Sequence, residues 1–128
     1  MKKKVLITGL TGKMGTASIP HFLKHKDKIK IRTVIRPAEK NRKLLDYYKK
    51  AQIEVVWGDL TQYEDVKKAV KDMDYILHLA AMVSPMADSD PEGAWAVNVG
   101  STQNLLRAID EWALTDIKFV YIGSVAQT

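Results

Sequence analysis

The first fifteen residues constrain the fold of this chain more than any other segment. An apolar run, residues 4–8, leads directly into a turn with glycines at positions 9, 12 and 15, and a helical pattern begins behind it. Glycine lets backbone N–H groups approach a phosphate closely, and a helix N-terminus adds partial positive charge. The segment therefore predicts a strand, a dinucleotide-binding turn and a helix in succession.

Each glycine of this turn has an expected role. Gly9 takes the tight turn, Gly12 lies under the phosphates, and Gly15 lets the helix pack closely against the first strand. The cofactor-binding residues expected at this turn are Gly9, Thr11, Gly12, Lys13, Met14 and Gly15.

Two other interpretations of the turn compete with a dinucleotide site. A phosphate loop of the ATPase type requires the pattern G-x-x-x-x-G-K-[ST], in which the final Ser or Thr binds magnesium. Ile7 stands in place of the first glycine and Met14 in place of the Ser or Thr, so this pattern fails at two positions. The other alternative is a tight strand-to-helix turn that binds no ligand.

Composition indicates one ordinary globular domain. Of the 128 residues, 46% are hydrophobic and 27% charged, and no apolar run is long enough to cross a bilayer, so we expect a cytoplasmic protein without membrane contact. The absence of cysteine excludes disulfides, thiolate metal sites and a cysteine nucleophile. The net charge of +5 comes from scattered lysines without interleaved aromatic residues, which disfavours nucleic-acid binding and is compatible with an anionic cofactor.

Strand and helix patterns alternate five times along the chain. This alternation predicts an α/β fold, a doubly wound, Rossmann-like parallel sheet of at least five strands with helices on both faces. The expected strands are residues 4–8, 30–35, 53–57, 75–79 and 118–122, and the expected helices are residues 15–26, with a kink at Pro20, then 38–51, 63–71 and 92–112. Ligands bind such sheets at the carboxyl ends of the strands, where Gly9, Arg36, Asp59, Ala80 and Ser124 should converge.

Arg36 follows the second strand, where the adenosine ribose of a dinucleotide is bound. An Asp or Glu about 20 residues beyond the glycines suits the ribose 2′-OH of NAD, whereas an arginine suits the 2′-phosphate of NADP. Arg36, with Lys40 and Arg42 close behind, therefore favours NADP, and NAD remains the alternative. The alternative to a cofactor role is that Arg36 is an ordinary exposed arginine at the end of a strand.

Asp59 follows the third strand after a glycine, where a carboxylate can accept a hydrogen bond from the adenine amino group. Helix capping is the alternative, because Asp59 and Thr61 both precede the helix at 63–71. His78, at the end of the fourth strand, is more typical of a hydrogen-bonded core residue than of a catalyst.

Five segments together resemble the N-terminal part of the extended short-chain dehydrogenase/reductases, the group of sugar-nucleotide epimerases and dehydratases. The matching segments are residues 8–15 (TGLTGKMG), 58–60 (GDL), 78–81 (HLAA), Asn98 with 102–106 (TQNLL), and 121–124 (YIGS). The resemblance covers essentially the whole chain but about half or less of a typical member. It implies a nicotinamide cofactor with Asp59 and Leu60 near adenine and with Ala80 and Ala81 beside the ribose next to the nicotinamide.

The resemblance also implies hydride transfer at C4 of the nicotinamide, assisted by a tyrosine, a lysine that lowers the pKa of that tyrosine, and a serine or threonine. Ser124 is the best match to the catalytic serine, although many members carry the working residue one position later, where this chain has Val125. A Tyr-x-x-x-Lys helix should follow the fifth strand, beyond Thr128. Tyr63 and Lys67 have the same spacing, but they lie between the third and fourth strands, and we interpret this as chance.

We therefore expect residues 1–128 to be the N-terminal dinucleotide-binding segment, without the substrate region, of an epimerase, dehydratase or reductase. Its substrate would be a sugar nucleotide or another small molecule with a hydroxyl or carbonyl group. The alternative is a non-catalytic NADP-binding sensor or regulatory module. An unpaired sheet edge would favour self-association, such as a homodimer.

Overall fold

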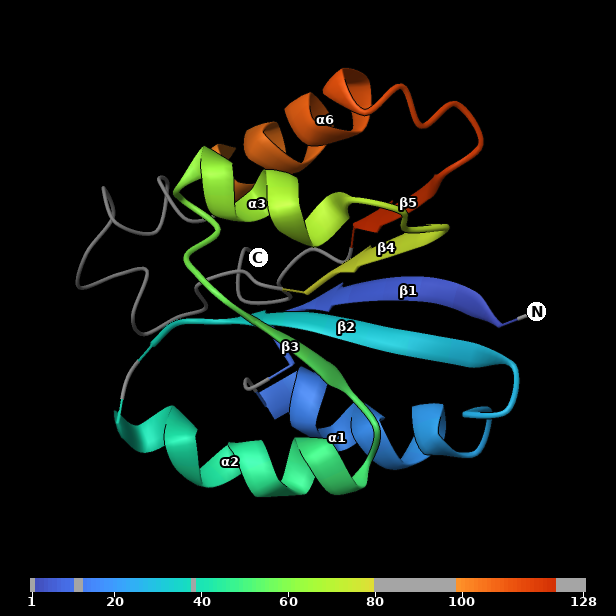
Figure 1. The fold of residues 1–128 in the computed structure, drawn as a ribbon, viewed down its shortest axis with the longest axis vertical. Helices are drawn as coiled ribbons and strands as arrows, with labels where there is room; N and C mark the ends of the chain where they lie inside the picture. Colours follow the sequence, from blue (N-terminus) through green and yellow to red (C-terminus); the bar gives the residue numbers. More distant parts are fainter. Residues whose placement is uncertain (1, 11–12, 38, 80–98, 122–128) are drawn as a thin grey trace, which may run out of the picture.

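Strands and helices alternate along the chain in the computed structural model (Figure 1), which describes residues 2–10, 13–37, 39–79 and 99–121. The elements in chain order are β1 (Lys3–Thr8), α1 (Lys13–Leu23), β2 (Ile29–Ile35), α2 (Glu39–Lys50), β3 (Glu54–Trp57), α3 (Tyr63–Val70), β4 (Tyr75–His78), α6 (Ser101–Glu111) and β5 (Lys118–Tyr121). None of the helices in these ranges has the length and apolar run needed to cross a membrane.

The five strands form one parallel sheet in the order β3-β2-β1-β4-β5. The chain moves outward from β1 to β3 and then returns to place β4 on the other side of β1. Leu6 of β1 therefore lies between Arg32 of β2 and Ile76 of β4. The order reverses between β1 and β4, and this confirms the predicted doubly wound sheet.

The predicted homodimer stays a prediction.

Helices cover both faces of the sheet, with α1 and α2 on one face and α3 and α6 on the other (Figure 1). Successive strand residues point to opposite faces, so Leu6 joins one hydrophobic core and Ile7 the other. Val66, Ile76 and Leu105 fill the core beneath α3 and α6, and residues such as Ile19 and Tyr48 fill the core beneath α1 and α2.

The end of helix α1 differs from the prediction. Helix α1 ends at Leu23 rather than near residue 26, because the N–H groups of His25 and Lys26 bond to carbonyls three residues earlier and tighten the chain into turns. Pro20 lies inside α1 and is exposed, and the predicted kink stays a prediction. The helix expected over 92–112 is described from residue 99 onward, and its earlier part lies outside the described residues.

Arg32 of β2 attaches helix α3 to the sheet. Its Nη1 donates to the carbonyl oxygens of Ala69 and Lys71, both at 2.9 Å, and its Nε donates to Glu54 of β3 at 3.0 Å. A cation near the last carbonyls of a helix also complements the helix dipole. This arrangement holds the end of α3 over β2 and β3.

Three helices end in the left-handed backbone region without using glycine. Gln52 after α2, Asp72 after α3 and Ala113 after α6 have φ values of 61°, 66° and 53°. Each stands two residues beyond the last residue of its helix, where glycine is the usual residue because it has no Cβ. Each of these turns therefore carries conformational strain.

We expect Ala113→Gly to raise the free energy of unfolding by about 0.5–1 kcal/mol, because glycine relieves the left-handed strain at an exposed position. The same change at Ala17, an exposed position inside α1, should lower the free energy of unfolding by about 1 kcal/mol. Urea denaturation of both variants checks the opposite signs. A loss of stability in both would contradict the prediction.

Candidate functional site

The carboxyl ends of β2 and β3 border a pocket of about 480 Å³, a size typical of small-molecule sites. Its described lining consists of Arg36, Pro37, Trp57, Gly58, Asp59 and Asp65. Arg36 follows Ile35 directly, and Ile35 pairs with Trp57 in the sheet. The parallel register thus brings Arg36 and Asp59, two of the predicted site residues, to one pocket. Their roles toward a cofactor stay predictions.

Hydrogen bonds from neighbouring residues hold the turn around Asp59 in one conformation. Oδ1 of Asp59 accepts from both the backbone N–H of Thr61, at 2.9 Å, and its hydroxyl, at 2.7 Å. The N–H of Asp59 donates to Oδ2 of Asp65 at 2.9 Å. Asp59 therefore braces its own turn rather than capping α3, whose N-cap residue Gln62 makes no side-chain cap bond. Its Oδ2 has no hydrogen-bond partner within the described residues, and so it can accept from a ligand.

Gly58 is required where the backbone passes Asp65. A Cβ at Gly58 would lie 2.7 Å from Cβ and 2.8 Å from Cγ of Asp65, closer than van der Waals contact allows. The Cβ of Asp65 is fixed to helix α3, so the clash cannot be relieved by rotating a flexible side-chain end. The glycine therefore sets the distance between the pocket wall and α3.

We expect Gly58→Ala to lower the free energy of unfolding by about 1–3 kcal/mol, because the overpacked Asp65 must shift and release the N–H of Asp59. Gly100→Ala is the matched control, since no atom of the described residues lies within 4 Å of its added Cβ and its backbone is helical. Chemical denaturation should show a loss for the first variant only. Equal stability of the two variants would contradict the packing argument.

Leu60, which the resemblance places near adenine, lies outside the described lining of the pocket, and its role toward a cofactor stays a prediction. Its side chain packs against the core beneath α3 and α6, and its carbonyl accepts a hydrogen bond from Nδ2 of Asn104 at 2.9 Å. Helix α6 thus adds a second hydrogen-bonded contact, besides that of α3, to the turn that contains Asp59.

The glycine turn after β1 has the backbone that the sequence predicts at its first position. Gly9 has a φ of 76°, in the region that favours glycine. Thr11 and Gly12 lie outside the described residues, and helix α1 begins at Lys13. The backbone of Lys13, Met14 and Gly15 therefore forms the first turn of α1, as a phosphate-binding helix N-terminus requires.

His78 is a buried core residue at the end of β4, 1% exposed, as the sequence suggested. Its Nδ1 lies 2.6 Å from Oγ1 of Thr8, and its Nε2 lies 3.1 Å from the hydroxyl of Thr102 and 3.3 Å from that of Ser101. Oγ1 of Thr8 also accepts the N–H of Leu79 at 3.0 Å. Three hydroxyl groups therefore surround the two ring nitrogens of His78.

Burial lowers the pKa of His78 from 6.5 to about 4, because the interior disfavours the charged ring. The neutral ring joins the ends of β1 and β4 to the start of helix α6. Thr8 immediately precedes Gly9, so this hydrogen-bond network fixes the residue from which the glycine turn begins.

The remaining predicted site residues, Ala80, Ala81 and Ser124, lie outside the described residues. Tyr63 and Lys67 lie on α3, away from the pocket lining, and the guanidinium of Arg107 stacks 3.8 Å from the ring of Tyr63. Burial, with Glu111 nearby, raises the pKa of Tyr63 to about 12. An acid/base tyrosine needs a lowered pKa, so this pair serves the contact between α3 and α6.

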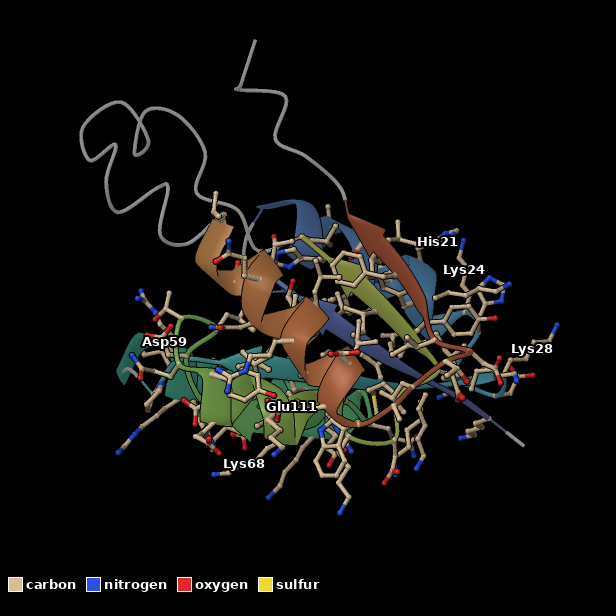
Figure 2. All side chains as sticks on the ribbon, turned by 90° about the horizontal axis from the view of Figure 1, so that it is seen from above. His21, Lys24, Lys28, Asp59, Lys68 and Glu111 are labelled. Carbon is tan, nitrogen blue, oxygen red and sulfur yellow. The ribbon has the colours of Figure 1, made fainter. Side chains whose placement is uncertain are left out.

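Figure 2 shows where Asp59 of the pocket lies relative to two lysines that follow α1. Asp59 lies at one end of the molecule, and Lys24 and Lys28 lie at the opposite end. These lysines therefore contribute to the net charge without facing the pocket.

Sequence reasoning assigned no ligand contact to four residues that line the pocket, Pro37, Trp57, Gly58 and Asp65. Trp57 carried a usable signal, because a large aromatic residue at the end of a strand and next to the predicted Asp59 turn is available to a ligand. Asp65 carried none, since its contact with Gly58 depends on how α3 packs over the turn.

The chain matches the sequence model of the NAD-dependent epimerase/dehydratase family over residues 5–128. A UDP-glucose 4-epimerase from Rickettsia bellii (strain OSU 85-389) is 34% identical over 110 residues, which cover 83% of this chain and 32% of that protein. The chain thus spans about a third of the length of the curated relatives it matches.

Solved structures agree with this match. The structure of Pen from Bacillus thuringiensis superimposes with a TM-score of 0.77 at 30% identity, covering 94% of this chain and 36% of that chain. The L-threonine dehydrogenase from Clostridium difficile superimposes with a TM-score of 0.76 at 26% identity, covering 98% of this chain and 37% of that chain.

Proposed function

Because this chain belongs to the NAD-dependent epimerase/dehydratase family, we propose that residues 1–128 bind a nicotinamide dinucleotide for an enzyme that acts on a sugar nucleotide. The observation that carries the proposal is the pocket at the carboxyl ends of β2 and β3, on the same edge of the sheet as the glycine turn that follows β1. Dinucleotides bind at this edge in sheets of this topology. The UDP-glucose 4-epimerase similarity supports the substrate class.

In this proposal the pyrophosphate, the adenine and the ribose of the dinucleotide each have a partner in the protein. The turn at Gly9 and the N-terminus of α1 bind the pyrophosphate through backbone N–H groups. Oδ2 of Asp59 accepts the adenine amino group, and Arg36 faces the ribose. The hydrogen bonds that Asp59 accepts from Thr61 and donates to Asp65 hold its turn in place before the ligand arrives. Preorganisation of this kind reduces the entropy lost on binding.

We propose NADP as the preferred dinucleotide, because the guanidinium of Arg36 can form paired hydrogen bonds to a 2′-phosphate. NAD is the second candidate, and two observations favour it. The family description specifies NAD, and the pocket lining carries two carboxylates, Asp59 and Asp65, beside the one guanidinium. Both carboxylates accept hydrogen bonds from the protein, which lowers their repulsion toward a phosphate.

When bound, the nicotinamide would supply hydride transfer to or from the substrate. We propose Ser124 as the residue of this chain that contacts the substrate oxygen, with the tyrosine and lysine contributed by residues beyond Thr128. The L-threonine dehydrogenase similarity makes a smaller hydroxyl compound the alternative substrate. A sensor that binds NADP without chemistry is the alternative from another functional class.

The complete natural protein tests these alternatives. Titration with NADPH and with NADH, followed by nicotinamide fluorescence, should give saturable binding. The enzyme proposal predicts a Tyr-x-x-x-Lys segment soon after Thr128, and replacing its tyrosine with phenylalanine should abolish turnover of a UDP-sugar while leaving NADPH affinity unchanged. Cofactor binding without such a segment would establish the sensor alternative, and absence of binding would overturn both.

A further inference from the structure

Trp57 is the large aromatic side chain in the described lining of the pocket. It ends strand β3, is 40% exposed, and lies beside Ile35 in the register of the sheet, one residue from Arg36. Burying a side chain of this size is strongly favourable, so an indole held at the mouth of a pocket is available for a ligand to cover.

The two described tryptophans differ in how the protein uses their rings. Trp112 donates its Nε1–H to the carbonyl of Lys67 at 2.9 Å, and the ammonium groups of Lys67 and Lys71 lie 5.5 Å and 5.6 Å from its ring. Within the described part of the chain, the ring of Trp57 makes no hydrogen bond, ring contact or cation–π contact. Trp112 therefore stabilises the fold, whereas the indole of Trp57 makes no such contact with the described residues.

We infer that Trp57 is the stacking surface for the adenine base of the dinucleotide. This inference rests on the proposed function, since it assigns a residue to the same pocket. The flat indole offers a π-face to a purine, while Asp59 can accept from the edge of that purine and Arg36 can bind the phosphate on its ribose. The three residues then recognise the face, the edge and the charge of one adenosine 2′-phosphate.

Affinity measurements on the complete protein separate stacking from simple loss of apolar surface. The probes are NADPH and 2′,5′-ADP, which carries the adenosine and the 2′-phosphate without nicotinamide. Trp57→Leu keeps an apolar side chain but removes the π-face, and it should weaken both ligands by about 5- to 150-fold. Trp57→Phe keeps an aromatic face and should lose less than about threefold. Tyr47→Leu, at an aromatic position that is 47% exposed and outside the described lining, should change neither affinity.

Fluorescence gives a second readout, which reports on the indole itself rather than on affinity. Binding of 2′,5′-ADP should quench tryptophan emission in the natural protein, because a purine stacks on the indole of Trp57. In Trp57→Phe the same ligand should still bind, as measured by calorimetry, but the quenching should disappear.

The outcomes distinguish the inference from the proposed function. If the natural protein binds NADPH, and Trp57→Leu binds NADPH and 2′,5′-ADP as tightly, the inference is wrong and the proposed function stands. Quenching that persists in Trp57→Phe also overturns the inference. If the natural protein binds neither NADPH nor NADH, the proposed function fails and the inference fails with it.

Discussion

Lowering the pH from 8 to 5 should cost the fold about 2 kcal/mol through His78 alone, and the cost should reach about 3 kcal/mol at pH 4. The pKa of this ring is about 4 in the folded protein and 6.5 when it is exposed by unfolding. The unfolded chain therefore binds the additional proton between pH 6.5 and 4. Stability from this residue is complete above pH 6.5, is lost as the pH falls through that window, and is gone below pH 4.

Two variants isolate this contribution in urea denaturation series at pH 8 and pH 5, where ordinary carboxyl groups titrate little. His78→Leu should lose about 2–4 kcal/mol at pH 8, because the hydroxyls of Thr8 and Thr102 would face an apolar side chain, and its remaining stability should change less with pH. His21→Gln, at an exposed histidine, should retain the full pH dependence. A natural protein with equal stability at pH 8 and pH 5 would show that His78 is not the neutral, buried group described above.

Replacing Arg36 with aspartate should reverse a preference for NADPH over NADH. Hydrogen bonds from a guanidinium to a phosphate are worth about 1.5–3 kcal/mol, which corresponds to about 10- to 150-fold in affinity. Aspartate removes these bonds and adds repulsion toward the 2′-phosphate, so NADPH affinity should fall by about 100-fold or more. NADH affinity should stay within about tenfold, because a carboxylate can accept from the 2′-OH.

Lys24→Asp is the charge-matched control for this experiment. It makes the same change in net charge at the end of the molecule opposite Asp59 (Figure 2), so it should leave the ratio of the two affinities unchanged. Calorimetric titration of the complete protein gives both constants. Equal affinity of the natural protein for NADPH and NADH would end the argument for Arg36, and so would an equal effect of the two substitutions.

The fold could be predicted because its determinants are local. Alternating apolar segments mark each strand, and the spacing of Gly9, Gly12 and Gly15 marks the first strand-to-helix turn. Because crossovers between parallel strands are right-handed, five alternating strand and helix segments predict one doubly wound parallel sheet. The same reasoning placed Arg36 and Asp59 at the carboxyl edge, where the structure brings them to one pocket.

The features that escaped prediction depend on residues far apart in the chain. Thr8 and His78 are 70 positions apart, and only the pairing of β1 with β4 places their polar atoms 2.6 Å from each other. The close contact between Gly58 and Asp65 depends on the path of α3 over the turn. Gln52 and Ala113 form left-handed turns without glycine, so residue propensities for the left-handed conformation do not predict these turns.

Those left-handed turns have a consequence for how the domain can be altered. In a parallel sheet the segments that lead from helices into strands gather at the amino edge, whereas Gly9, Arg36 and Asp59 follow strands and lie at the carboxyl edge. The two edges lie at opposite ends of the strands, and the effects of well-separated substitutions on the free energy of unfolding should add within about 0.5 kcal/mol. Thermal tolerance and ligand choice are then independent variables in this domain, and selection or engineering can change one without a compensating change in the other.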